Sequence, residues 1–277
     1  MYLQRDVRLV HTLSSVVGIF MATASATGLS YREAIYPTDD LLQSFLSNDV
    51  LNLVVGLPIL YGSMWLARRG QLIGLLFWPG ALFFVLYNYI VYVFAMPLNA
   101  AFLLHLTLVT LSVYTVIGLI ATIDGKAVQQ RLSGAVPERL AGGVLVGLGL
   151  LFLLRVIGVI VHALLSQAPM AETEIAVHTS DFLISPAFVI GGVLLWRREA
   201  LGYVTGLSLL FQASMLFIGL ILFLLLQPLL TPVPFAPVDV AVIFAMGLIC
   251  FIPFALFVHG VLTNRDPPAA ESTTTSG

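Results

Sequence analysis

The chain has 277 residues, of which 59% are hydrophobic and only 9% are charged, whereas an ordinary soluble domain carries roughly 25% charged residues. A mean hydropathy of +1.02 excludes a water-soluble globule of this length. The 12 Lys or Arg residues do not outnumber the 14 Asp or Glu residues, so no basic excess is present to bind nucleic acid. The only cysteine, Cys250, excludes a disulfide scaffold. The composition therefore predicts an integral membrane protein whose main partner is the lipid bilayer.

Eight apolar stretches are long enough to be transmembrane helices, because a spanning helix needs about 20 mainly apolar residues. In chain order they are 9–28, 49–67, 71–95, 98–121, 140–165, 174–196, 200–226 and 238–262. Their hydrophobic runs do not alternate with polar residues, as the strands of a membrane β-barrel would. The sequence therefore predicts an all-α bundle of eight transmembrane helices.

The basic residues predict how this bundle is oriented. With eight spans, one side carries ten of the cations: Arg5, Arg8, Arg68, Arg69, Lys126, Arg131, Arg139, Arg197, Arg198 and Arg265. The other side carries only Arg32, and Arg155 lies inside the fifth span. The positive-inside rule then places both termini in the cytoplasm. Eleven Arg to one Lys is typical of a prokaryotic source, which favours the prokaryotic plasma membrane.

The second and sixth spans share a series of landmarks in the same order. Asp49, Trp65, Arg68-Arg69 and Gly74 correspond to Asp181, Trp196, Arg197-Arg198 and Gly202. We expect a tandem repeat of two parallel four-helix units, 1–121 and 140–264, joined by a cytoplasmic linker, 122–139. The alternative is coincidence, because Trp and Arg favour membrane borders in any case. The tail, 265–277, is polar and of low complexity, and is predicted to be disordered.

Polar residues inside the predicted spans gather in the half of the bundle away from the cationic side. A buried charge in hydrocarbon costs several kcal/mol, so each such residue must be paired, hydrated or functional. This pattern predicts a polar cavity that is open to the outside and closed towards the cytoplasm. The candidate ligand-binding residues are Asp49, Asn52, Asn88, Tyr92, Arg155, His178, Asp181 and Asp239.

Arg155 is the most informative of these residues, because it lies deep within a predicted helix. The fifth and sixth spans are joined by a short loop and should be antiparallel neighbours, which brings Asp181 to a similar depth. We therefore predict an ion pair between Arg155 and Asp181. The pair would either fix helix packing or serve as an internal countercharge in a binding site.

Two prolines fall in corresponding predicted helices. Pro58 and Pro186 are both expected to interrupt their helices in the outer half. Paired interruptions can free backbone groups to face a substrate or an ion, as in many transporters. The simpler interpretation is that membrane helices tolerate proline kinks generally.

Three histidines, His105, His162 and His178, come from three spans at similar predicted depth. Three imidazoles suit zinc, which would make an intramembrane zinc hydrolase, and a pair of them would suit a b-type haem. No HExxH spacing is present, so the simpler interpretation is hydrogen bonding between helices.

The leading functional prediction is binding or passage of a small polar solute or ion through an outward-facing cavity, with no cofactor. The first alternative is the zinc hydrolase, and the second is a non-catalytic membrane subunit or lipid-binding scaffold. The sequence indicates neither the substrate nor the oligomeric state.

Overall fold

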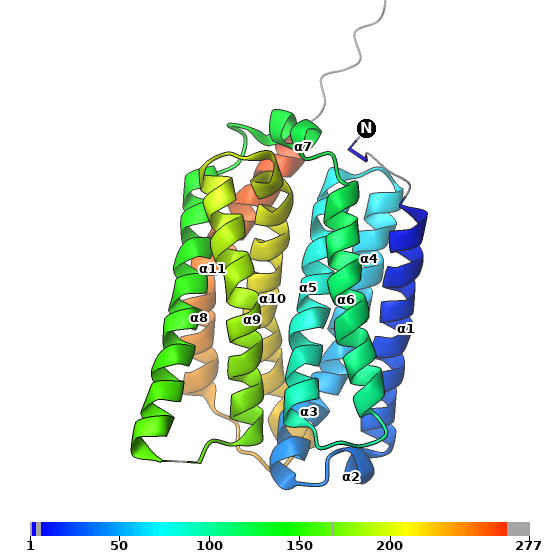
Figure 1. Ribbon diagram of the computed structural model, residues 1–277, viewed down its shortest axis with the longest axis vertical. Helices are drawn as coiled ribbons and strands as arrows, with labels where there is room; N and C mark the ends of the chain where they lie inside the picture. The colour runs from blue at the N-terminus through cyan, green and yellow to red at the C-terminus, as the bar shows by residue number, and fades with distance from the viewer. Residues whose placement is uncertain (1, 4–6, 168, 265–277) are drawn as a thin grey trace, which may run out of the picture.

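The computed structural model describes residues 2–3, 7–167 and 169–264. Over this part of the chain it is helical, and eight helices are long and apolar enough to cross a membrane, as predicted (Figure 1). They are α1 (Arg8–Ser30), the continuous helix α3–η1–α4 (Asp39–Arg68), α5 (Leu72–Ala95), α6 (Phe102–Thr122), α8 (Glu138–Ser166), α9 (Glu172–Trp196), α10 (Ala200–Leu230) and α11 (Pro237–Thr263). The tail predicted to be disordered, together with Arg5 and Arg265, lies outside the described residues.

Two short helices lie in the connections. The helix α2 (Arg32–Ile35) follows α1, and α7 (Gly125–Leu132) lies within the segment predicted as a linker. The Asp124 side chain accepts hydrogen bonds from two backbone N–H groups in the first turn of α7, both at 3.1 Å, which is the usual way to cap a helix N-terminus.

The second of these eight helices differs from the sequence prediction in where it begins and in being continuous through its proline. It begins at Asp39, ten residues earlier than expected, with the Thr38 hydroxyl accepting a hydrogen bond from the first turn. Asp49 therefore lies in the third turn and is buried, rather than at the mouth of the helix. Pro58 does not break the second helix, which passes from the π-helical turn η1 (Asn52–Gly56) directly into α4, and α9 likewise continues through Pro186.

The helix α5 forms the centre of the bundle: 78% of its spanning window is buried, against 22% for α8 and α11. It packs against α4, α6, α9 and α10, and Figure 1 shows α5 beside α10, between α1, α4 and α6 on one side and α8, α9 and α11 on the other. The α5–α10 contact is close because Gly80 faces the backbone of Ser208. The Ser208 hydroxyl also donates a 2.7 Å hydrogen bond to the Leu76 carbonyl. Small residues of this kind allow membrane helices to approach closely.

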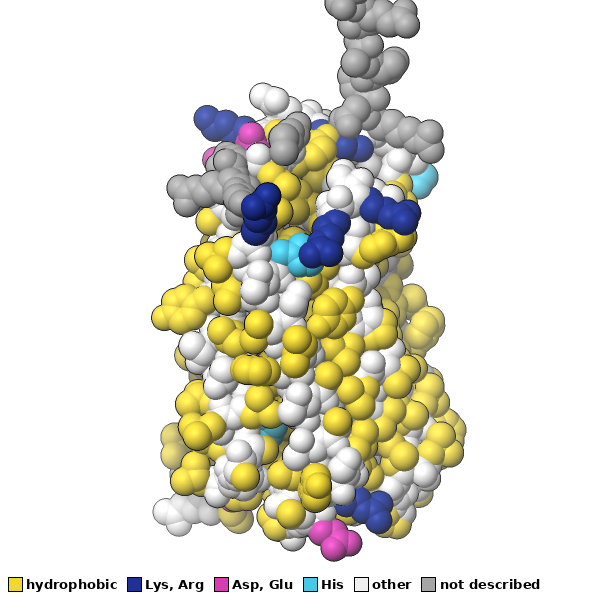
Figure 2. Space-filling model, turned by 90° about the vertical axis from the view of Figure 1, so that its right-hand side faces the viewer, with side chains coloured by type: hydrophobic (Ala, Val, Ile, Leu, Met, Phe, Trp, Pro, Cys, Tyr) yellow, Lys and Arg dark blue, Asp and Glu magenta, His cyan; other side chains and the backbone are white. Residues whose placement is uncertain are grey.

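Basic side chains gather at one end of the molecule, which we call the basic end. Figure 2 shows Lys and Arg side chains concentrated where α7 and the N-terminus lie. The described cations at this end are Arg8, Arg68, Arg69, Lys126, Arg131, Arg139, Arg197 and Arg198. The opposite end contains α2, the start of α3 and the α8–α9 and α10–α11 connections.

Candidate functional site

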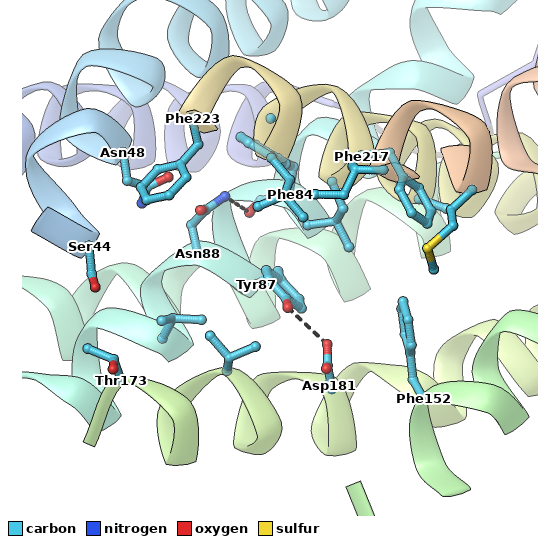
Figure 3. Close-up of a pocket in the computed structure, with 18 of the residues that line it drawn as sticks. Ser44, Asn48, Phe84, Tyr87, Asn88, Phe152, Thr173, Asp181, Phe217 and Phe223 are labelled. Carbon is cyan, nitrogen blue, oxygen red and sulfur yellow. Dashed lines mark hydrogen bonds between the residues drawn. The ribbon is translucent and has the colours of Figure 1, made fainter. Parts of the chain in front are cut away.

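A cavity of about 540 Å³ lies between the two groups of helices. Its wall comes from α3, α5, α8, α9, α10 and α11, and most of the lining side chains are hydrophobic (Figure 3). It lies in the half of the bundle away from the basic end, because its lining residues belong to the late part of α5 and the early part of α9. The volume falls within the range of sites for small organic ligands.

One wall of the cavity carries a charged pair. Arg155 on α8 donates a 2.7 Å hydrogen bond to Asp181 on α9, which confirms the predicted ion pair. The Asp181 side chain is only 4% exposed, whereas that of Arg155 is 50% exposed. Asp181 also accepts a 2.9 Å hydrogen bond from the Tyr87 hydroxyl on α5 (Figure 3). Asp181 is thus fully engaged, while the other N–H groups of Arg155 have no partner among the described residues.

Amide side chains line a second part of the same cavity. Asn88 donates to the carbonyl of Phe84 one turn earlier on α5, at 2.9 Å, which leaves its side-chain oxygen free to accept. Asn48 on α3 lines the cavity and donates to the Tyr92 hydroxyl at 3.3 Å. Polar groups therefore occur at a few defined positions on an otherwise apolar wall.

Asn48 connects the cavity to a buried cluster around Asp49. The Tyr92 hydroxyl donates to Asp49 Oδ1 at 2.8 Å, and the Tyr36 hydroxyl donates to Asp49 Oδ2. Burial, reinforced by the Asp49 carboxylate, raises the pKa of Tyr36 well above its usual value, so this hydroxyl stays protonated and remains a donor. Tyr36 lies in the connection between α2 and α3, where no periodic pattern in the sequence marks it as part of a site.

Three aromatic side chains pack together between the level of the cavity and the basic end. Phe77, Phe211 and Phe254 come from α5, α10 and α11, with ring centroids 4.6 to 5.9 Å apart. Each lies closer to the basic end of its helix than the cavity residues of the same helix do. We call these three residues the aromatic floor.

The other predicted site residues lie away from this cavity. Asn52 is buried in η1, and neither of its side-chain polar atoms has a hydrogen-bond partner in the part of the chain that the structure describes. His178 lies 3.6 Å from Glu174 and lines a second cavity of about 250 Å³ between α8 and α9. Asp239 is exposed in the first turn of α11.

The structure does not bring the three predicted metal-ligating histidines together. His105 is buried against Tyr92 and Tyr89, with ring centroids 5.0 and 5.7 Å away, and His162 is exposed on α8. Within residues 2–3, 7–167 and 169–264, no group of three or more His, Cys, Asp or Glu side chains is arranged to hold a metal ion. The geometry therefore gives no support to the zinc hydrolase alternative.

Comparison of the chain with models of protein families, with curated proteins and with solved structures finds no significant match. Function therefore has to be inferred from the geometry of the site itself.

Proposed function

We propose that this protein is a polytopic membrane protein that binds a small amphipathic molecule in the cavity between its two groups of helices. The observation that carries this proposal is an apolar cavity of about 540 Å³ with the Arg155–Asp181 pair on its wall. A purely polar solute would make few favourable contacts with the apolar lining, whereas an amphipathic molecule has an apolar body for that lining and a polar group for the Arg155–Asp181 pair. This narrows the small polar solute predicted from the sequence to one with an apolar body.

The head group of the ligand would bind at Arg155. Asp181 already neutralises this arginine, but the guanidinium has five donor N–H groups in a rigid fork, and most of them face no protein acceptor. Asn88 and Arg155 both line the cavity. A carboxylate is the head group that best uses a planar guanidinium, so we propose an amphiphile with a carboxylate head.

The membrane orientation supports entry from the outer leaflet. By the positive-inside rule, the basic end would face the cytoplasm and both termini would lie there. The cavity then opens towards the outer half of the bilayer. Next to it, α8 and α11 expose large apolar side chains, among them Leu151, Leu154, Val242 and Phe244. A lipid-soluble molecule could pass between these helices without crossing a polar surface.

We also propose that the two helix groups are copies of one four-helix unit. In each unit the second helix packs on the third, the third on the fourth, and the first on the fourth. The landmarks Gly74 and Gly202 both pack against the last turn of the preceding helix. They are 128 positions apart, as are Gly80 and Ser208, which face each other where α5 meets α10. Contact between equivalent positions is what a two-fold axis along the membrane normal would produce.

The test is thermal unfolding of the purified protein with single-chain amphiphiles of equal length that carry either a carboxylate or an ammonium head. We expect the carboxylate series to raise the unfolding temperature and the ammonium series to have no specific effect. Arg155→Gln should abolish the response, whereas Arg139→Gln, at the basic end, should retain it. An equal response to both heads, or an unchanged response in Arg155→Gln, would contradict the proposal.

A second variant keeps the proposal testable if Arg155→Gln is unstable. Gly219 lines the cavity on α10, and a Cβ there would make only ordinary contact, at 3.7 Å, with Phe84. Gly219→Phe should therefore fill the cavity without disturbing the charged pair. The variant should fold and lose amphiphile binding, and retained binding would show that the ligand lies elsewhere.

Passage of the ligand to the other leaflet would require the aromatic floor to open. Phe77, Phe211 and Phe254 separate the cavity from the basic end. Transport would therefore be measured as movement of a labelled amphiphile between leaflets in proteoliposomes, with Phe211→Ala expected to accelerate it.

A further inference from the structure

Asp49 is a buried carboxylate with hydrogen-bond donors but no countercharge. Its side chain is 1% exposed and accepts hydrogen bonds from the hydroxyls of Tyr36 and Tyr92. Within the described parts of the chain it forms no ion pair, whereas the corresponding Asp181 is paired with Arg155. The two hydroxyls can stabilise the carboxylate by hydrogen bonding, but they bring no positive charge to it. An ionised carboxylate buried without a cation is costly.

Unpartnered polar side chains lie next to this carboxylate. Contacts between α1 and the second spanning helix run as a ladder: Gly28 packs against Asp49, and Met21 packs against Gly56. Four residues after Met21 comes Ser25, and four residues before Gly56 comes Asn52. Since the two helices run in opposite directions, Ser25 and Asn52 lie at the same level of the ladder.

Both of these residues have unused hydrogen-bonding capacity. Ser25 is 0% exposed and Asn52 is 1% exposed. The Ser25 hydroxyl and both polar atoms of the Asn52 side chain have no hydrogen-bond partner among the described residues. Ser25 lies beside the Asp49 carboxylate and the Tyr89 hydroxyl, without the geometry of a full hydrogen bond to either. Buried polar groups are almost always satisfied, so a set of them beside a carboxylate points to a bound species.

The local backbone supplies a further oxygen. The π-helical turn η1 begins at Asn52, and such turns are frequent at functional sites. Pro58, just beyond the turn, has no amide hydrogen, so one carbonyl of the turn loses its helical donor. Carbonyls freed in this way coordinate small cations in membrane proteins.

We propose that Asp49, Asn52 and Ser25 form a binding site for one monovalent cation of the size of Na⁺. The donor set consists of oxygen atoms, which hard cations prefer, and it carries a single negative charge. A bound Na⁺ neutralises Asp49 and satisfies the Ser25 and Asn52 oxygens, and the two tyrosine hydroxyls hold the carboxylate in place. None of these three residues lines the amphiphile cavity, and the existence of the cation site does not depend on the proposed function.

The experiment is a titration of the purified protein with NaCl at constant ionic strength maintained with choline chloride, followed by thermal unfolding. We expect a saturable rise in unfolding temperature with Na⁺. Asp49→Asn should lose this rise, and Asn52→Leu should weaken the apparent affinity by about tenfold or more. Asp239→Asn is the matched control, because Asp239 is exposed on α11 and should leave the Na⁺ response unchanged.

Three results would overturn the proposal. Absence of a saturable Na⁺ effect in the wild-type protein would show that no such site exists. An equal effect of choline would indicate a response to ionic strength alone. A Na⁺ effect that persists in full in Asp49→Asn would show that the ion binds elsewhere. If Asp49→Asn does not fold, Ser25→Ala serves in its place, since it removes one ligand and leaves the carboxylate and both tyrosines intact.

Discussion

Replacing Gly80 by alanine is expected to destabilise the bundle by about 1–3 kcal/mol, the usual cost of overpacking a close contact. A Cβ at this position would overlap the backbone carbonyl oxygen of Ser208 and lie 2.7 Å from Phe211 Cδ1. Ordinary van der Waals contact begins near 3.4 Å, so the Phe211 ring would have to move by about 0.7 Å, and α5 and α10 would have to separate to relieve the closer contact with Ser208. Because one of the overlapping groups is backbone, a change of rotamer cannot relieve the clash. The same separation would stretch the 2.7 Å hydrogen bond from Ser208 to Leu76.

The measurement is unfolding in mixed detergent micelles, followed by tryptophan fluorescence. The matched control is Gly147→Ala on α8, where a Cβ would meet nothing within 4 Å. That variant should be neutral or gain up to about 1 kcal/mol from helix propensity. Equal stability of the Gly80→Ala and Gly147→Ala proteins would refute the argument that contact with the backbone of α10 requires glycine.

Two further predictions concern the buried polar groups. Arg155→Gln should lower the free energy of unfolding by about 1–3 kcal/mol, less than the loss of a fully buried pair, because Arg155 is half exposed. It should cost more than Asp181→Asn, because Asp181→Asn leaves no buried charge. The reverse order of the two variants in chemical unfolding would contradict this prediction. The raised pKa of Tyr36 gives stability that is present below about pH 10 and lost at higher pH. Relative to Tyr36→Phe, the wild-type protein should therefore lose stability above about pH 10, and parallel pH profiles of unfolding would show that Tyr36 is exposed.

The sequence predicted the features that follow directly from the requirements of a bilayer. The eight helices long and apolar enough to cross a membrane were recognisable, because backbone groups in lipid must be satisfied within a helix about 20 residues long. The pair of Arg155 and Asp181 was recognisable because a deep arginine needs an acid at its own depth on an adjacent helix. In both cases an apolar environment allows few other arrangements of the polar groups.

The features that were missed depend on tertiary contacts with no periodic signal. The start of the second span was placed too late because 39–48 is too polar to resemble a membrane segment. The part played by Tyr36 was not predicted, since it lies in a connection and reaches Asp49 only after folding. Proline was expected to break two helices, but a sequence alone does not distinguish a break from a π turn or a continuous helix.

The π turn η1 has a consequence for the angular phase of its helix. Asp49 and Trp65 are separated by 16 positions, whereas Asp181 and Trp196 are separated by 15, and one extra residue is what a π turn accommodates. Deleting Val54, which is exposed within η1, would restore a regular α-helix. The segment from Asp39 to Asp49 would then rotate by about 100° relative to the rest of the helix, turning Asp49 away from Tyr92. The extra residue in the π turn thus sets which neighbours the segment from Asp39 to Asp49 faces, without changing the contacts of the part of the helix that ends at Arg68.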